Sequence, residues 1–131
     1  AIAAINQYPI LRRWIHSILL VAPANPARFG IHRFASDDEN LSSLFKQYTI
    51  LVPALMVVSE NDPWLSLPDA LDYANIWDIP YVNQGQAGHI NVASGYKEWP
   101  QVLSYMENIH DQNRLTAEDY FLNHRHFRFA V

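Results

Sequence analysis

The chain has no cysteine, and this absence excludes several kinds of chemistry. Disulfide bonds, thiolate metal sites and a cysteine nucleophile all need a thiol that the sequence does not supply. Only four glycines are present and no glycine-rich loop, which argues against a phosphate-binding loop. No apolar run reaches the roughly 18 residues of a membrane span, and no signal peptide is visible. We therefore expect a cytoplasmic protein that binds no membrane.

Positive charge is also scarce. Nine Lys and Arg residues stand against thirteen Asp and Glu residues, for a formal net charge of −4. A nucleic-acid-binding surface needs clustered Lys and Arg, so we expect no nucleic-acid partner. Apolar residues are abundant instead: half of the 131 residues are hydrophobic and 13% are aromatic. That amount is enough for the core of about one domain.

Short apolar runs predict three strands. The runs at residues 18–22 and 54–59 are continuously apolar or nearly so and are bounded by Pro23 and Pro53, which is typical of strands buried on both faces. A third, shorter strand is expected in "IPYVN", residues 79–83. Residues 25–40 contain proline, glycine and an acidic cluster, and we expect them to form an irregular connection.

Helical patterns separate the predicted strands. They occur in "AIAAINQY", in "LSSLFKQY" and in two longer segments, residues 66–78 and 97–110. In the first of these longer helices Ser66 is the expected cap, with Pro68 in the first turn and Asp69 at the capping-box position. In the second, the apolar positions predict an inward face made of Val102, Leu103, Met106 and Ile109.

This order of elements predicts an α/β protein with a mostly parallel sheet flanked by helices. We assign residues 1–110 to that domain and residues 111–131 to a C-terminal extension. The extension carries His124 and His126, which would share one face of an extended strand. Arg125 lies between them and no zinc-site spacing is present, so we expect no metal site and no cofactor.

The stretch "QGQAGHINVASGYKEWP", residues 84–100, places His89 among small and polar residues. This is loop composition, and loops on a rigid scaffold often carry catalytic residues. Asp62 follows the second predicted strand and His89 follows the third, so both are expected at the carboxyl edge of the sheet. An acid followed by a histidine matches the last two members of a nucleophile–acid–histidine triad. Taken singly, the tripeptide "NDP" would be an ordinary turn, and a lone loop histidine would be exposed to solvent. Asp78 is the alternative acid, but it is expected at the end of a helix, at the opposite edge of the sheet.

Three stretches, "ILLVAPANP", "VVSENDPW" and "AGHINVASGYKEWP", resemble the small serine hydrolases of the α/β-hydrolase superfamily typified by retinoblastoma-binding protein nine and its bacterial relatives. The resemblance covers residues 1–110. It implies the C-terminal half of an α/β-hydrolase, with Asp62 as the triad acid and His89 as the general base. The other residues of the motif would be structural. Asn91 and Ser94 would tie the loop together. Gly95 would supply a turn, and Trp99 would pack against the following helix.

The serine nucleophile of this family is not found in the sequence. The family places it in a G-x-S-x-G motif, at the turn between a strand and a helix, and no serine of this chain lies in such a motif. We expect the serine about five residues before Ala1, in a part of roughly 60–80 residues. The chain alone would then be inactive. Its open sheet would need that segment or a second copy as a partner.

The intact protein would be an esterase-like hydrolase of a small ester or amide, with pocket walls from residues 23–34 and Trp64. A protein-interaction module on the same frame is the alternative.

Overall fold

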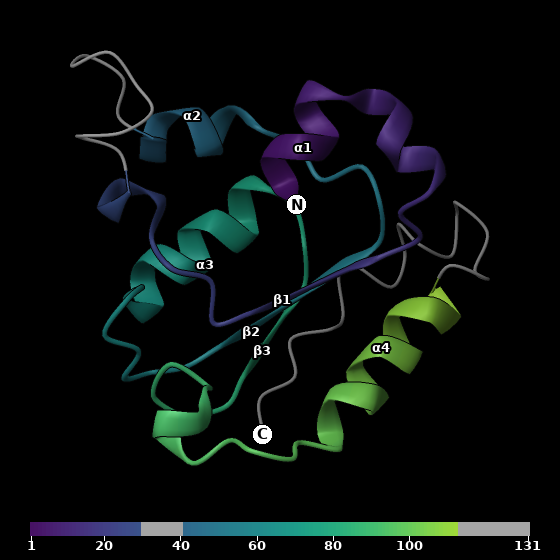
Figure 1. The fold of residues 1–131 in the computed structure, drawn as a ribbon. Coiled ribbons are helices and arrows are strands. Elements are labelled where there is room, and N and C mark those ends of the chain that lie inside the picture. The colour runs from purple at the N-terminus through teal and green to yellow at the C-terminus, as the bar shows by residue number, and fades with distance from the viewer. Residues whose placement is uncertain (30–40, 113–131) are drawn as a thin grey trace.

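The computed structural model describes residues 1–29 and 41–112, and Figure 1 shows their arrangement. Three strands, β1 (Ile18–Val21), β2 (Ala54–Val58) and β3 (Tyr81–Asn83), form one sheet in the order β1-β2-β3. Both neighbouring pairs are parallel, with Leu20 beside Met56 and Met56 beside Tyr81. The predicted α/β fold with a parallel sheet is therefore confirmed.

Helices occur where the sequence predicts them. The α-helices are α1 (Ile2–Gln7), α2 (Leu41–Gln47), α3 (Leu67–Ile76) and α4 (Gln101–Gln112). Three short 3₁₀ turns accompany them: η1 (Pro9–Arg13), η2 (Pro26–Arg28) and η3 (Val92–Ser94). No helix in the described parts of the chain is long and apolar enough to cross a bilayer. The pair His124 and His126 lies outside the described residues.

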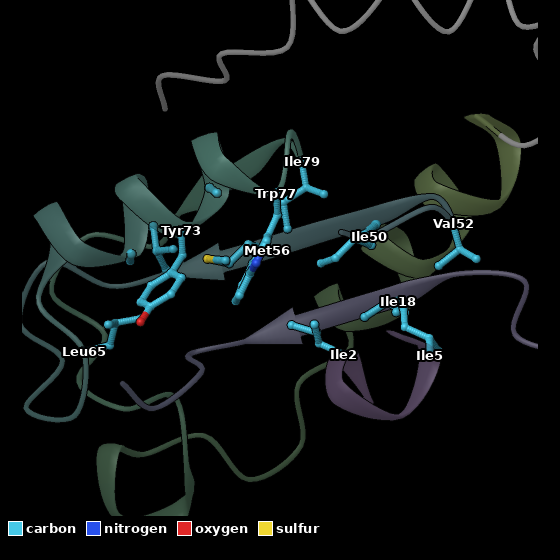
Figure 2. Packing of buried hydrophobic residues seen from close by; sticks show 14 residues of the cluster. Ile2, Ile5, Ile18, Ile50, Val52, Met56, Leu65, Tyr73, Trp77 and Ile79 are labelled. Carbon is cyan, nitrogen blue, oxygen red and sulfur yellow. The ribbon is translucent and has the colours of Figure 1, made fainter. Parts of the chain in front are cut away.

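The central strand β2 is buried on both faces, as its apolar run predicts. Met56 points into a cluster with residues of α1, α3 and β1, which Figure 2 shows from close by. Val57 points to the opposite face, where it lies in a second cluster with Tyr105 and Ile109 of α4. Successive side chains of a strand alternate between the two faces of a sheet. The two clusters therefore hold helices on both sides of β2.

Helix α3 begins as its sequence predicts. Ser66 Oγ accepts a hydrogen bond from the Asp69 backbone N–H at 3.3 Å and donates to Asp69 Oδ2 at 2.7 Å. Pro68 lies in the first turn, where its missing N–H costs nothing. At the other end, buried Trp77 donates its indole N–H to the Phe45 carbonyl at 2.9 Å. This bond ties α2 to the end of α3.

The predicted inward face of α4 is partly wrong. Ile109 is 1% exposed and Val102 is half-buried, but Leu103 is 64% exposed and Met106 is 41% exposed. Tyr105 takes the inward position instead, and its hydroxyl accepts a hydrogen bond from Gln84 Nε2. Burial raises the pKa of the Tyr105 phenol above its ordinary value. A helix on one side of a sheet buries one stripe, and in α4 that stripe contains Tyr105 and Ile109.

This orientation of α4 predicts unequal stability effects. Ile109→Ala is expected to lower the free energy of unfolding by about 2–5 kcal/mol, because it leaves a cavity in the core. Leu103→Ala on the same helix is expected to change it by less than about 0.5 kcal/mol, because the side chain is exposed. Urea denaturation of both variants measures the difference. Equal losses would mean that α4 docks through another face.

Candidate active site

The turn after β2 carries an acid with little contact to solvent. The side chain of Asp62 is 3% exposed. Its Oδ1 atom accepts a hydrogen bond from the Trp64 backbone N–H at 2.8 Å, which fixes the direction of the carboxylate. Backbone N–H donors of this kind stabilise the ionised carboxylate.

The loop after β3 brings His89 to this acid. His89 Nδ1 lies 3.1 Å from both carboxylate oxygens of Asp62. The structure therefore joins the two residues that the sequence placed at the same edge of the sheet. The His89 side chain remains 26% exposed, so a reactant can approach it from solvent. Because Nδ1 faces the carboxylate, Nε2 is directed away from it and is the ring atom that can meet such a reactant.

Small residues allow the backbone of this loop to turn sharply. Gly85 and Gly88 have φ angles of 66° and 60°, and Ile90, directly after the histidine, has a φ of 47°. Glycine adopts such left-handed conformations at little cost, whereas a β-branched residue such as isoleucine is strained there. Buried Ala87 and Ile90 anchor the loop against the core on either side of the partly exposed histidine.

The signature residues after His89 hold the loop, as predicted. Ser94 Oγ accepts from the His89 backbone N–H at 3.2 Å, and Asn91 Oδ1 accepts from the Ser94 backbone N–H at 3.0 Å. Gly95 ends η3 with a φ of 91°. Trp99 lies edge-on to Tyr105 of α4, with ring centroids 5.8 Å apart. Each of these four residues therefore has a structural role.

An aromatic side chain lies beside the histidine, and a cation lies over that aromatic ring. The ring of Trp64 is tilted against the His89 ring, with centroids 5.8 Å apart. The Arg28 guanidinium lies 4.6 Å from the centre of the Trp64 ring, and it donates a hydrogen bond to the Pro63 carbonyl. The Asn25 backbone N–H donates to the Trp64 carbonyl at 3.0 Å. These contacts join segment 25–28 to the turn that holds Asp62.

Metal binding finds no support in the parts of the chain that the structure describes. No group of three or more His, Asp or Glu side chains lies close enough there to hold an ion. At the edge of the sheet, an oriented imidazole lies next to a nearly buried carboxylate, which is a pairing that can accept and return a proton.

Two glycines of the loop offer a matched test of its geometry. A Cβ atom on Gly88 would lie 2.5 Å from Ser94 Oγ, whereas one on Gly85 would meet nothing within 4 Å. Both substitutions to alanine place a side chain at a positive φ, which costs about 1–2 kcal/mol. Gly88→Ala is expected to lose about 1 kcal/mol more, because it displaces the Ser94 hydroxyl from the His89 N–H. Urea denaturation gives both values; equal losses would show that Ser94 moves aside freely.

Comparisons with known proteins found one family and one solved structure that this chain resembles. The family model described as serine hydrolase matches residues 1–108. The crystal structure of a YdeN-like hydrolase from Pectobacterium atrosepticum superposes with a TM-score of 0.66 at 31% sequence identity, over 86% of this chain. The chain spans only 55% of that hydrolase's length. No curated protein matches the sequence.

Proposed function

Because the chain belongs to the serine hydrolase family, we propose that Asp62 and His89 are the acid and the general base of a Ser-His-Asp triad. The observation that supports this proposal is the contact of His89 Nδ1 with both oxygens of a nearly buried carboxylate, at 3.1 Å each. A carboxylate in this place holds the imidazole in the Nδ1–H tautomer and stabilises the imidazolium that forms during reaction.

The proposed reaction is hydrolysis of an ester or amide through an acyl-enzyme. A serine hydroxyl attacks the substrate carbonyl while His89 Nε2 takes the hydroxyl proton, and a tetrahedral intermediate forms. The intermediate collapses as His89 returns the proton to the leaving alcohol or amine. Water then attacks the acyl-serine, with His89 again accepting and returning a proton. Asp62 stays ionised throughout.

We place the nucleophilic serine in a segment that precedes Ala1. The 131 residues contain no G-x-S-x-G, and the matched hydrolase is longer than the part that this chain covers. Within the described residues β1 pairs only with β2, which leaves its outer edge open. A strand that carries the serine would pair with this edge and bring its hydroxyl toward His89. A second copy of the chain is the other partner that we expect for an open edge.

The proposed substrate site lies against Trp64. Its side chain is 44% exposed and lies beside the His89 ring, so it offers an apolar wall to a small acyl or leaving group. Aromatic walls of this kind are common in small-molecule sites. The Arg28 guanidinium lies over the same ring, so it adds a positive charge next to this apolar surface.

A fluorophosphonate probe tests the proposal on the full-length protein. Such probes react with the activated serine of a working triad. We expect one labelled serine, in a G-x-S-x-G peptide from the segment before Ala1, identified by digestion and mass spectrometry. Absence of labelling together with absence of ester hydrolysis would contradict an enzyme. It would favour the alternative, a protein-interaction module on a hydrolase frame.

A further inference from the structure

The backbone that leads into His89 is held by side chains from two directions. The consecutive N–H groups of Ala87, Gly88 and His89 donate to three side-chain oxygens in turn. Ala87 N lies 3.1 Å from Ser59 Oγ, and Gly88 N lies 2.7 Å from Asn61 Oδ1. His89 N lies 3.2 Å from the Ser94 hydroxyl of the same loop. The first two acceptors come from the end of β2, so they join two different loops.

Ser59 and Asn61 also bind to each other. Ser59 Oγ donates to Asn61 Oδ1 at 3.0 Å, with the Gly85 carbonyl as a second acceptor at 3.2 Å. Ser59 is 2% exposed, so its hydroxyl has no water to replace these partners. The Asn61 oxygen thus receives two hydrogen bonds, one from β2's own end and one from the histidine loop.

We propose that Ser59 and Asn61 are positioning residues that set the distance between Asp62 and His89. This inference rests on the proposed function. The decisive bond joins the residue before the acid, Asn61, to the residue before the histidine, Gly88. The acid and the base lie on separate loops, which follow β2 and β3. A direct link between their immediate neighbours therefore controls how the two side chains meet.

The geometry of the pair explains why such a link matters. Both distances from His89 Nδ1 to Asp62 are 3.1 Å, near the long end for an N–H···O hydrogen bond. A displacement of the loop by less than an ångström would break the contact. Misplacement of a catalytic group on that scale costs up to about 100-fold in rate.

The test uses three variants of the full-length protein. Asn61→Leu removes the acceptor at similar volume, and Asn61→Asp keeps an acceptor oxygen in the same place. Asn75→Leu makes the matched change at an exposed position of α3. Ester hydrolysis is measured on the plateau of each variant's pH–rate profile. A shift of that profile along the pH axis, caused by the charge that Asn61→Asp adds, then does not change the compared rates. The ¹H NMR resonance of the His89 Nδ1 proton reports the bond to Asp62 without any turnover.

We expect Asn61→Leu to lower kcat by about 10- to 100-fold while KM changes less than about twofold. Its thermal midpoint should fall only about a few degrees below that of Asn75→Leu, because Ser59 Oγ keeps the Gly85 carbonyl as an acceptor. Its Nδ1 proton resonance should broaden or vanish. Asn61→Asp should restore kcat to within about threefold of the parent and keep the resonance.

Two results would overturn the inference: a kcat for Asn61→Leu equal to that of Asn75→Leu, or a kcat for Asn61→Asp as low as that of a folded Asn61→Leu. Failure of the proposed function is recognised separately, because His89→Gln would then leave hydrolysis unchanged. In that event the Nδ1 resonance still decides whether Asn61 holds the pair together.

Discussion

Replacing His89 by glutamine is expected to lower the kcat for ester hydrolysis by the full-length protein by about 10⁵- to 10⁶-fold, the loss expected when the general base of the proposed Ser-His-Asp triad is removed. Glutamine has no group that takes a proton near neutral pH, so the serine hydroxyl would have to attack without a base. The side chain is 26% exposed, and a polar residue of similar size is tolerated there. Pre-steady-state hydrolysis of a chromogenic ester measures the rate of acyl-enzyme formation directly.

Gln86→Ala is the matched control for this variant. Gln86 is exposed in the same loop, three residues before the histidine. We expect its rate to stay within about twofold of the parent, since substitutions at exposed positions without special contacts have small effects. If His89→Gln retained more than about one per cent of kcat, His89 would not be the general base.

Asp62→Asn is expected to lower kcat by about 10⁴-fold through the wrong imidazole tautomer. The Trp64 backbone N–H donates to Asp62 Oδ1, so the amide oxygen of an asparagine would stay on that donor. The amide NH₂ would then take the place of Oδ2 and face His89 Nδ1. A ring nitrogen facing a donor must accept, which moves the ring proton to Nε2. An imidazole protonated at Nε2 cannot accept the serine proton.

The fallback acid supplies the control for the Asp62 experiment. Asp78 precedes β3 and is exposed, with a φ of 52° that asparagine also adopts readily. Asp78→Asn is expected to keep kcat within about twofold, while its fold stays intact. If Asp78→Asn showed the large loss and Asp62→Asn did not, the acid of the triad would have been assigned wrongly. A ¹⁵N NMR spectrum of His89 would show the expected change of tautomer in Asp62→Asn.

Local chemistry accounts for most of what the sequence predicted correctly. The strands at 18–21 and 54–58 have apolar side chains on both faces, and a run of this kind is stable only between two layers. The start of α3 at Ser66 depends on a hydroxyl and a carboxylate three residues apart. The meeting of Asp62 and His89 follows from a general rule: loops after parallel strands lie at one edge.

Tertiary structure decided the features that depend on partners distant in the chain. Leu103 and Met106 have the hydrophobicity of core residues, yet both are exposed. Tyr105 lies on the inward face of α4 instead, in the cluster with Val57 and in a hydrogen bond with Gln84. Similarly, Ser59 and Asn61 belong to an ordinary strand end and turn, and nothing nearby in the sequence indicates that they bind the backbone before His89.

The sequence by itself therefore determined the α/β fold, the order of the elements and the pair of residues at the edge of the sheet. Only the tertiary structure decided which face of α4 is buried and which groups hold His89 at 3.1 Å from Asp62. The physical reason is one of range. Periodicity and capping act over a few residues, whereas a hydrogen bond between Asn61 and Gly88 forms only after β2 and β3 have paired.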